Sequence, residues 1–316
     1  MKILITGGSG FIGTNVIKYY LNKGDSVLNI DIKPPKEKAF KSCWVKTDIT
    51  SYKNLKTVIL EFRPEYIIHL AARTDLDGKS IKEYRANTVG TENIIKIANQ
   101  ITTLKRVIFT SSMLVCMPGH IPKHNSEYSP TTFYGESKVE MEKIINIGYH
   151  NYEWLIVRPT SIWGPYFGKP YRDFFDLLIK NHYFHIGVKQ CTKTYGYVEN
   201  IIKQLDSFLL TNKDLVHKNT FYLGDYDPTN IRIWADEIAF ELGISLKTIP
   251  FSLIKIVSII GDVLSKFRIS FPITSFRLKN MTTDNIVSLS NTQKITPVLP
   301  YTRVEGIRKT LDWIER

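Results

Sequence analysis

A run of glycines near the start of the chain places the strongest restriction on its fold. Gly7-Gly8-Ser9-Gly10-Phe11-Ile12-Gly13 directly follows a short apolar run at 3–6 and precedes a segment at 11–22 with the length and spacing of a helix. Because glycine has no Cβ, the backbone can turn tightly here and approach a pyrophosphate. The N–H groups that begin the helix then face the phosphate charge. The run therefore predicts a dinucleotide-binding turn between a strand and a helix.

Beyond the glycines, short β-branched runs alternate with helical segments as far as about residue 165. We expect strands at 3–6, 26–30, 43–45, 66–70, 106–110 and 154–158, and helices at 11–22, 52–61, 81–100 and 133–147. This alternation predicts an α/β fold with a doubly wound parallel sheet. Later helices are expected near 171–181, 198–210, 231–242, 251–267 and 302–314. We expect a nucleotide-binding domain over 1–165 and a smaller, mainly helical substrate region over 166–316, some of whose segments return to the first domain.

The composition is that of a globular protein with ample material for a core. The chain has 316 residues, of which 43% are hydrophobic and 23% are charged. Its cysteines (Cys43, Cys116 and Cys191) lie far apart without a C-x-x-C pair, so we expect neither a disulfide framework nor a metal site. This cysteine usage fits a reducing, cytoplasmic location. The first apolar run is too short for a signal peptide, and no targeting segment is expected.

The chain carries a formal net charge of +12, which favours an acidic partner such as a phosphorylated small molecule, a nucleic acid or an anionic membrane surface. The lysines are scattered, with no basic run and no nucleic-acid motif. A solvated surface is therefore the simpler interpretation, and no nucleic-acid partner is expected.

The longest apolar stretch, at 249–264, is interrupted by Lys255, Gly261 and Asp262 and falls short of a membrane span. Within the helix expected at 251–267, polar residues recur every three or four positions and form one narrow stripe. We expect the broad apolar face to pack against the body of the protein. Attachment to a membrane surface or a dimer face stays open, without stable membrane insertion.

Asp31 ends the second expected strand, about 20 residues beyond the glycines. An acid at this place can accept hydrogen bonds from the ribose of an adenosine. Its charge repels a 2′-phosphate, so NAD is favoured over NADP as the cofactor. The alternative is an exposed aspartate at a strand end with no role in binding.

Tyr134 and Lys138 form a Tyr-x-x-x-Lys pair, which a helix places on one face. A phenol has a pKa near 10, and we expect the cation and an oxidised nicotinamide to lower that pKa. Tyr134 could then take a proton from a substrate hydroxyl while hydride leaves the same carbon. The pairs Tyr19/Lys23 and Tyr52/Lys56 have the same spacing and are expected to be surface pairs without a partner. Tyr134 differs because it follows a strand ending at Ser112, at the sheet edge where ligands bind.

These residues together resemble the extended short-chain dehydrogenase/reductase family, in particular its NAD-dependent nucleotide-sugar epimerase/dehydratase branch. Further matching stretches are 47–50 (Thr-Asp-Ile-Thr), 69–72 (His-Leu-Ala-Ala) and 87–91 (Asn-Thr-Val-Gly-Thr). The resemblance implies a Rossmann fold, a homodimer through the two long helices beside the catalytic strand, and a supporting role for Asn87. It implies catalysis by Ser112, Tyr134 and Lys138, and cofactor binding by Gly7, Gly10, Phe11, Ile12, Gly13, Asp31, Asp48, Ile49, Leu70, Ala71, Ala72, Tyr134 and Lys138.

Departures from the family pattern narrow the chemistry. In the 4,6-dehydratases the catalytic Thr is followed by Asp-Glu, and in the decarboxylases a Glu stands beside the hydroxyl residue. Here Ser112 is followed by Met113 and Leu114, which cannot transfer a proton, so neither reaction is expected. Lys193 falls where relatives often carry a diphosphate-binding Arg, and Arg277 is a second basic candidate. We expect these two residues, with Ser112 and Tyr134, to bind the substrate.

The resemblance predicts an NAD-dependent nucleotide-sugar 4-epimerase that acts through a transient 4-keto intermediate. An alternative is an NAD(P)-dependent keto-sugar reductase or an oxidoreductase like the 3β-hydroxysteroid dehydrogenases, because the stretch 277–284 resembles that side branch equally well. An alternative of another class is a non-catalytic NAD-binding sensor module.

Overall fold

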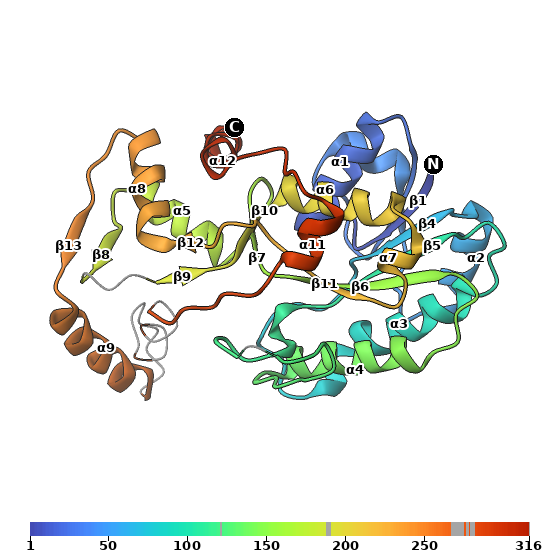
Figure 1. Cartoon of the computed structure of the whole chain (residues 1–316), viewed down its shortest axis with the longest axis horizontal. Helices are drawn as coiled ribbons and strands as arrows, with labels where there is room; N and C mark the ends of the chain where they lie inside the picture. The colour runs from blue at the N-terminus through green and yellow to red at the C-terminus, as the bar shows by residue number, and fades with distance from the viewer. Residues whose placement is uncertain (121, 188–190, 267–274, 276–277, 279–281, 316) are drawn as a thin grey trace.

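The computed structural model describes residues 1–120, 122–187, 191–266, 275, 278 and 282–315. Its centre is a parallel seven-stranded sheet in the order β11-β6-β5-β4-β1-β2-β3 (Figure 1). From β3 to β6 this is the order of a doubly wound Rossmann sheet, so the expected fold class is confirmed. The strands are β1 (Lys2–Thr6), β2 (Ser26–Asp31), β3 (Trp44–Lys46), β4 (Tyr66–His69), β5 (Arg106–Thr110), β6 (Glu153–Pro159) and β11 (Thr220–Leu223).

Helices cover both faces of this sheet because its strands are apolar on both sides. Successive strand residues point to opposite faces, so Ile3 and Ile5 pack with one set of helices and Leu4 packs with the other. The first face carries α1 (Phe11–Asn22) and α6 (Val198–Leu210), and the second carries α2 (Tyr52–Phe62), α3 (Arg85–Ala98) and α4 (Phe133–Ile147).

Two elements of this half differ from the expectation. The helix expected at 81–100 is divided, since Ile81–Tyr84 forms a 3-10 turn (η2) and the α-helix begins only at Arg85. The Tyr84 hydroxyl donates to Asp75 O at 2.8 Å and ties this turn to the preceding loop. Strand β11 was not expected, and together with α6 it brings chain from beyond residue 165 back to the sheet.

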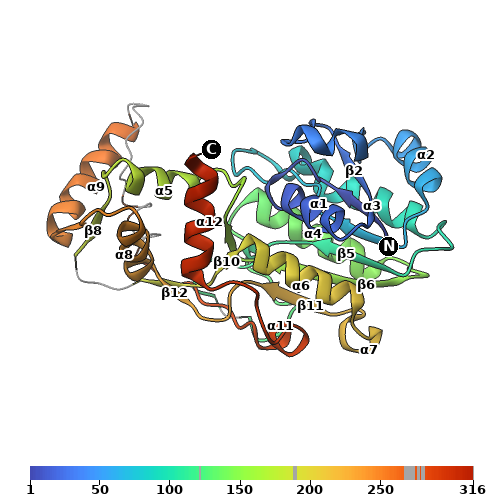
Figure 2. The same ribbon diagram turned by 90° about the horizontal axis from the view of Figure 1, so that it is seen from above.

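A smaller lobe lies at the other end of the long axis (Figure 1, Figure 2). It contains short pairs of strands instead of a continuous sheet, and α12 (Arg303–Glu315) packs against its helix α8. Short elements α7 (Lys213–Val216) and α11 (Ser290–Ile295) lie beside β6 and β11, and a 3-10 turn η1 (Lys38–Cys43) precedes β3. The lobe consists of the pairs β7 (Ser161–Trp163) with β10 (Tyr195–Tyr197), β8 (Phe184–Ile186) with β13 (Lys247–Ile249) and β9 (Thr192–Lys193) with β12 (Thr229–Asn230), and of α5 (Tyr171–Ile179), α8 (Ile231–Glu241) and α9 (Phe251–Lys266).

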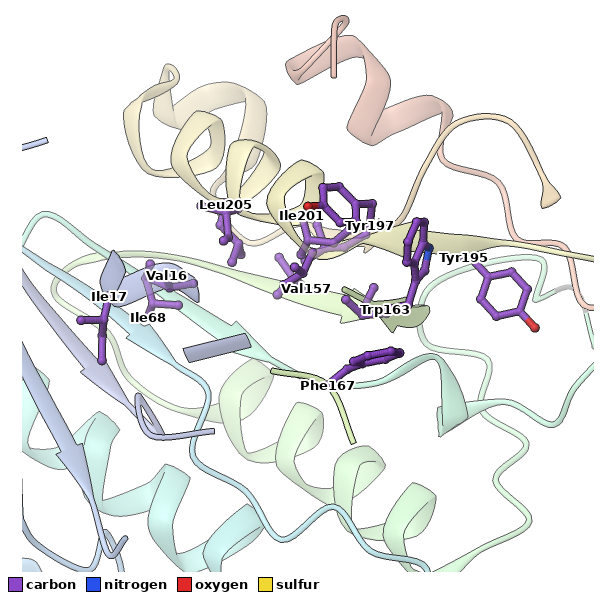
Figure 3. Packing of buried hydrophobic residues seen from close by; sticks show 14 of the residues in the cluster. Val16, Ile17, Ile68, Val157, Trp163, Phe167, Tyr195, Tyr197, Ile201 and Leu205 are labelled. Atoms are coloured by element: carbon purple, nitrogen blue, oxygen red, sulfur yellow. The ribbon is translucent and has the colours of Figure 1, made fainter. Parts of the chain in front are cut away.

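One apolar core joins the sheet to the smaller lobe. Figure 3 shows Val16 and Leu205 packed with the sheet, and Trp163 and Tyr195 continuing the same cluster towards the lobe. The Trp163 ring centroid lies 5.1 Å from that of Trp234 in α8. This continuous packing holds the smaller lobe beside the carboxyl edge of the sheet.

Helix α9 corrects the expectation that its broad apolar face packs against the protein. The buried side contains Ile254 and Ser258, whereas four large aliphatic side chains on the outer side are each more than half exposed (Leu253, Ile256, Ile259 and Ile260). Of the polar stripe, Ser258 is buried and Asp262 Oδ1 accepts a hydrogen bond from Ser275 N at 3.0 Å, whereas Ser252 and Lys255 are exposed. Within the described part of the chain, no helix is long and apolar enough to cross a membrane.

Candidate active site

A cleft of about 860 Å³ runs along the carboxyl edge of the sheet. Its walls come from the segments that follow β1, β2, β4 and β5, and from the end of β6, as expected for an open α/β sheet. Every predicted cofactor-binding and catalytic residue lines this one cleft: Gly7, Gly10, Phe11, Ile12, Gly13, Asp31, Asp48, Ile49, Leu70, Ala71, Ala72, Ser112, Tyr134 and Lys138.

The glycine turn begins the cleft, and its shape depends on the missing side chains. Gly7 has φ +74°, and a Cβ there would lie 2.6 Å from Ala71 N. A Cβ at Gly13 would lie 2.3 Å from Gly7 O, so α1 could not approach the turn. Gly10 is the N-cap of α1 and provides no side-chain cap. The start of this helix is therefore shaped to receive a phosphate group.

Two aspartates stand at the ends of β2 and β3, further along the cleft. Asp31 Oδ2 accepts from Ser9 N at 3.0 Å and Asp31 Oδ1 accepts from Lys33 N at 2.9 Å. These bonds hold the carboxylate between the glycine turn and the strand end. Asp48 Oδ1 accepts from the backbone and the hydroxyl of Thr50, both at 2.8 Å. Both carboxylates are thus fixed in position by the chain itself.

Tyr134 and Ser112 meet at the inner end of the cleft. Thr132 Oγ1 accepts from Gly135 N at 3.0 Å and caps α4, so Tyr134 lies on the first turn of that helix. A Cβ at Gly135 would lie 2.4 Å from Leu114 O, in the 3-10 turn η3 (Met113–Val115) that Ser112 begins. The close approach that Gly135 permits brings the two hydroxyl residues together, and sequence reasoning missed this glycine.

In the chain alone, the pKa of Tyr134 lies above that of a free phenol. Burial raises its pKa to about 12, a hydrogen bond with Ser112 acts in the opposite direction, and Tyr84 adds to the rise. Lys138 Nζ donates to Thr110 O at 2.8 Å, and Lys138 is not among the groups that shift the pKa of Tyr134 in the chain alone. Burial lowers the pKa of Lys138 to about 7, although the Glu142 carboxylate raises it. In the chain alone, desolvation by burial is the largest influence on the pKa of each side chain.

A buried ion pair lies behind Lys138 and was not predicted. Arg158 donates to Glu142 through Nε at 2.8 Å and Nη2 at 2.7 Å, and both side chains are almost fully buried. The Tyr128 hydroxyl donates to Glu142 Oε2 at 3.0 Å. Since Glu142 lies one turn after Lys138 on α4, this pair places a fixed negative charge near the lysine.

Asn87 connects the segments that carry the site, in keeping with the supporting role that the resemblance implies. Its side chain exchanges hydrogen bonds with the backbone of Arg73, accepting from N at 2.8 Å and donating to O at 3.0 Å. It also donates to Ser137 Oγ at 2.8 Å, and Ser137 Oγ donates to Tyr134 O at 2.7 Å. One side chain thus holds the loop after β4 against the first turn of α4.

The cleft fits NAD in shape and in chemistry. It reaches without interruption from the glycine turn to Tyr134. Thr110 Oγ1 and Ser111 Oγ, which line its inner part, are buried and have no hydrogen-bond partner among the described residues. A bound polar molecule would satisfy both hydroxyls.

Lys36 also lines the cleft, and its Nζ donates to Tyr166 O at 2.6 Å, so it links the loop after β2 to the chain after β7.

Of the two predicted substrate residues outside the catalytic set, the structure describes only Lys193. Lys193 lies on the two-residue strand β9 and is not among the described residues that line the cleft. Burial lowers the pKa of Lys193, while Cys191 and Asp284 raise it. Arg277 lies outside the described residues.

The pair Tyr19/Lys23 corrects the expectation of a surface pair without a partner. The Tyr19 hydroxyl donates to Asp206 Oδ2 at 2.9 Å, and Lys23 Nζ donates to Asp206 Oδ1 at 3.1 Å. Both residues therefore connect α1 to α6, far from the cleft. The pair Tyr19/Lys23 therefore packs two helices together, whereas the pair Tyr134/Lys138, with the same spacing, lines the cleft.

The fold and the site define an NAD-binding enzyme of the extended short-chain dehydrogenase/reductase type. Residues 3–224 match the model of the NAD dependent epimerase/dehydratase family. The chain belongs to this family, and NAD is its cofactor.

Three similar proteins illustrate the range of this family. The chain is 29% identical over 273 residues to a 3-beta-hydroxysteroid dehydrogenase of Mycolicibacterium neoaurum, covering 79% of this chain and 73% of the relative. It is 23% identical to the N-acetyl-alpha-D-glucosaminyl-diphospho-ditrans,octacis-undecaprenol 4-epimerase of Escherichia coli O157:H7, covering 99% and 95%. The structure of the UDP-glucose 4-epimerase of Thermus thermophilus with NAD superposes with a TM-score of 0.73 at 18% identity, covering 100% and 99%. The last similarity is one of fold.

Proposed function

We propose that this protein is an NAD-dependent 4-epimerase of nucleotide sugars that acts through a transient 4-keto intermediate. The observation that supports this proposal is the meeting of Tyr134 and Ser112 at the inner end of the NAD cleft, where Met113 and Leu114 stand in place of proton-transferring side chains. Such a site can exchange a proton and a hydride at one carbon. It has no acid next to Ser112 for eliminating water or losing carbon dioxide.

In the proposed reaction, Tyr134 accepts the proton of the 4-hydroxyl and later returns a proton to the same oxygen. Ser112 forms a hydrogen bond with that oxygen and keeps it near the phenol. NAD supplies a reversible hydride acceptor when it is bound. The 4-keto sugar would turn in the site between the two proton transfers, so the configuration at this carbon would change with no net oxidation of the sugar.

Lys138 completes the proposed site by holding the nicotinamide ribose. A tyrosine with a pKa of about 12 is a poor base at neutral pH, and a nearby positive charge lowers that pKa. The bond from Lys138 to Thr110 O keeps its ammonium at the end of β5, beside the cleft. The oxidised nicotinamide of bound NAD would add a positive charge beside Tyr134, so Tyr134 would become an effective base when NAD is bound.

An oxidoreductase acting on a hydroxysteroid or a keto sugar is the second candidate. The relative from Mycolicibacterium neoaurum favours it, because that similarity extends over 79% of the chain. The same Tyr134, Ser112 and Lys138 would serve this reaction, in which the hydride leaves the site with the cofactor. The two candidates therefore differ in whether NADH accumulates.

The test incubates the purified protein with NAD and a panel of UDP-, GDP-, CDP- and dTDP-sugars, a polyprenyl-diphosphate sugar and 3β-hydroxysteroids. Products are resolved by chromatography and NMR, and NADH is followed by its absorbance. We expect one epimeric pair to interconvert from either side without accumulation of NADH. Stoichiometric NADH would establish the oxidoreductase instead, and bound NAD without any turnover would establish a sensor module.

The proposal also includes a cytoplasmic location and a homodimer formed through α3 and α4.

A further inference from the structure

The outer face of α9 is a continuous apolar surface. Successive residues of an α-helix are about 100° apart, which places Leu253, Ile256 and Ile260 on one side with Ile259 next to them. The exposed fraction is 51% for Leu253, 57% for Ile256, 53% for Ile259 and 51% for Ile260. Single exposed aliphatic residues are common on proteins, but a contiguous patch indicates an interaction surface. We call these four residues the α9 patch.

The stretch of sequence that contains α9 is basic. Between residues 247 and 280 the sequence contains six basic residues and one acidic residue, a net +5 of the +12 of the whole chain. Lys247 and Lys255 are exposed. Lys255 lies on α9 itself and Lys247 lies on the preceding strand β13, so a second copy docked patch to patch would bring like charges together. An anionic lipid surface matches both the apolar side chains and the charge.

The position and length of α9 suit a flat membrane surface. Both views place the helix at the end of the long axis that is remote from the seven-stranded sheet (Figure 1, Figure 2). Its 16 residues extend about 24 Å, which is shorter than the hydrocarbon core of about 30 Å. The helix can therefore lie in the plane of the headgroups with one face inserted, but it cannot span the bilayer.

We propose that α9 docks the protein on an anionic bilayer, with the α9 patch inserted among the acyl chains and the nearby lysines at the lipid phosphates. The smaller lobe then faces the membrane. The docking extends the proposed 4-epimerase chemistry, on which this last step rests, from nucleotide sugars to sugars whose diphosphate is attached to a membrane lipid.

The test measures sedimentation of the full chain, loaded with NAD, with vesicles of phosphatidylcholine alone or mixed with phosphatidylglycerol. We expect binding to the mixed vesicles that weakens as salt is added, and little binding to phosphatidylcholine alone. The double variant Ile256→Ser/Ile260→Ser should bind the mixed vesicles at least about tenfold more weakly. Lys255→Glu should weaken binding about fivefold, and only to the mixed vesicles.

The control variant is Leu210→Ser/Leu215→Ser, whose leucines are 53% and 55% exposed beside the large sheet. It should bind vesicles like the wild type, and circular dichroism and NAD binding verify that each variant is folded. Absence of vesicle binding, or an equal loss in the control, overturns the docking. The docking is also overturned if no vesicle binding is seen and the wild type is a dimer in analytical ultracentrifugation, whereas Ile256→Ser/Ile260→Ser is a monomer. In that case a second copy covers the patch.

Vesicle binding is measured without turnover, so the docking and the proposed function can fail separately. The lipid-linked substrate is supported if the protein epimerises a polyprenyl-diphosphate sugar in mixed vesicles and Ile256→Ser/Ile260→Ser does so more slowly. Turnover of a soluble substrate should be the same in the wild type and in this variant. Vesicle binding with turnover of soluble nucleotide sugars alone supports the docking and overturns the lipid-linked substrate.

Discussion

Helices α1 and α9 both have a broad apolar face, but their surroundings differ. Val16 and Ile17 of α1 are fully buried, whereas Ile256 and Ile259 of α9 are more than half exposed. α1 lies on a seven-stranded sheet, which provides a wide apolar surface for the helices on each face. α9 lies in a lobe whose strands are only paired, and no described element covers its outer face. The apolar pattern predicts which face tends to leave water, and the neighbouring surface decides whether the chain itself covers that face.

The same contrast applies to the residues of the site. The cofactor residues follow parallel strands whose carboxyl ends meet at one edge, so their convergence is a property of the fold. Lys193 lies on a two-residue strand that pairs with β12 in the smaller lobe, and it also forms an isolated β-bridge with Asn285. The first half therefore provides the residues predicted to bind the cofactor, and we propose that the smaller lobe determines which substrate is bound beside them.

Replacing Tyr134 by Phe is the strongest test of the cofactor half. Turnover should fall by about 10²- to 10⁴-fold, because the proton acceptor is lost. NAD binding should stay close to that of the wild type, since the glycine turn and Asp31 are unchanged. Turnover is measured by product NMR and NAD binding by calorimetry.

Tyr19→Phe is the matched control, because Tyr19 has the same spacing to a lysine but donates to Asp206. It should lower the free energy of unfolding by about 1 kcal/mol and leave turnover unchanged. Turnover retained in Tyr134→Phe would show that the cleft contains another base.

A smaller effect is expected when Gly13 is replaced by Ala. The new Cβ would lie 2.3 Å from Gly7 O and 2.5 Å from Gly8 Cα, and these backbone atoms cannot rotate away. The free energy of unfolding should fall by about 3 kcal/mol, as measured by urea denaturation. Gly168→Ala is the control, because nothing lies within 4 Å of its Cβ position. Equal stability of the two variants would contradict the tight packing of α1 against the turn.

The sequence predicts the cofactor half well because its signals are local. The bounds of α1, α4 and α6 agree with the spacing of their apolar residues, and the glycine turn indicates the cleft. Strand β11 was missed because it belongs to the sheet only through pairing with β6, which lies far away in the chain. The raised pKa of Tyr134 was missed because burial depends on packing from several elements. The partner of Tyr19, Asp206, likewise comes from a distant helix.

The contrast between the two regions is sharpened by a pair of variants with separate effects. Asp31→Asn should weaken NAD binding about tenfold and reduce the preference for NAD over NADP, because a charged hydrogen-bond acceptor is lost. Lys193→Met should raise the KM for the sugar diphosphate about tenfold, because a phosphate loses its cation, and should leave NAD binding unchanged. Calorimetry with NAD and NADP, and initial rates at varied sugar concentration, separate the two effects. If Lys193→Met altered NAD binding instead, the lysine would act on the cofactor half, and the division of labour between sheet edge and smaller lobe would be wrong.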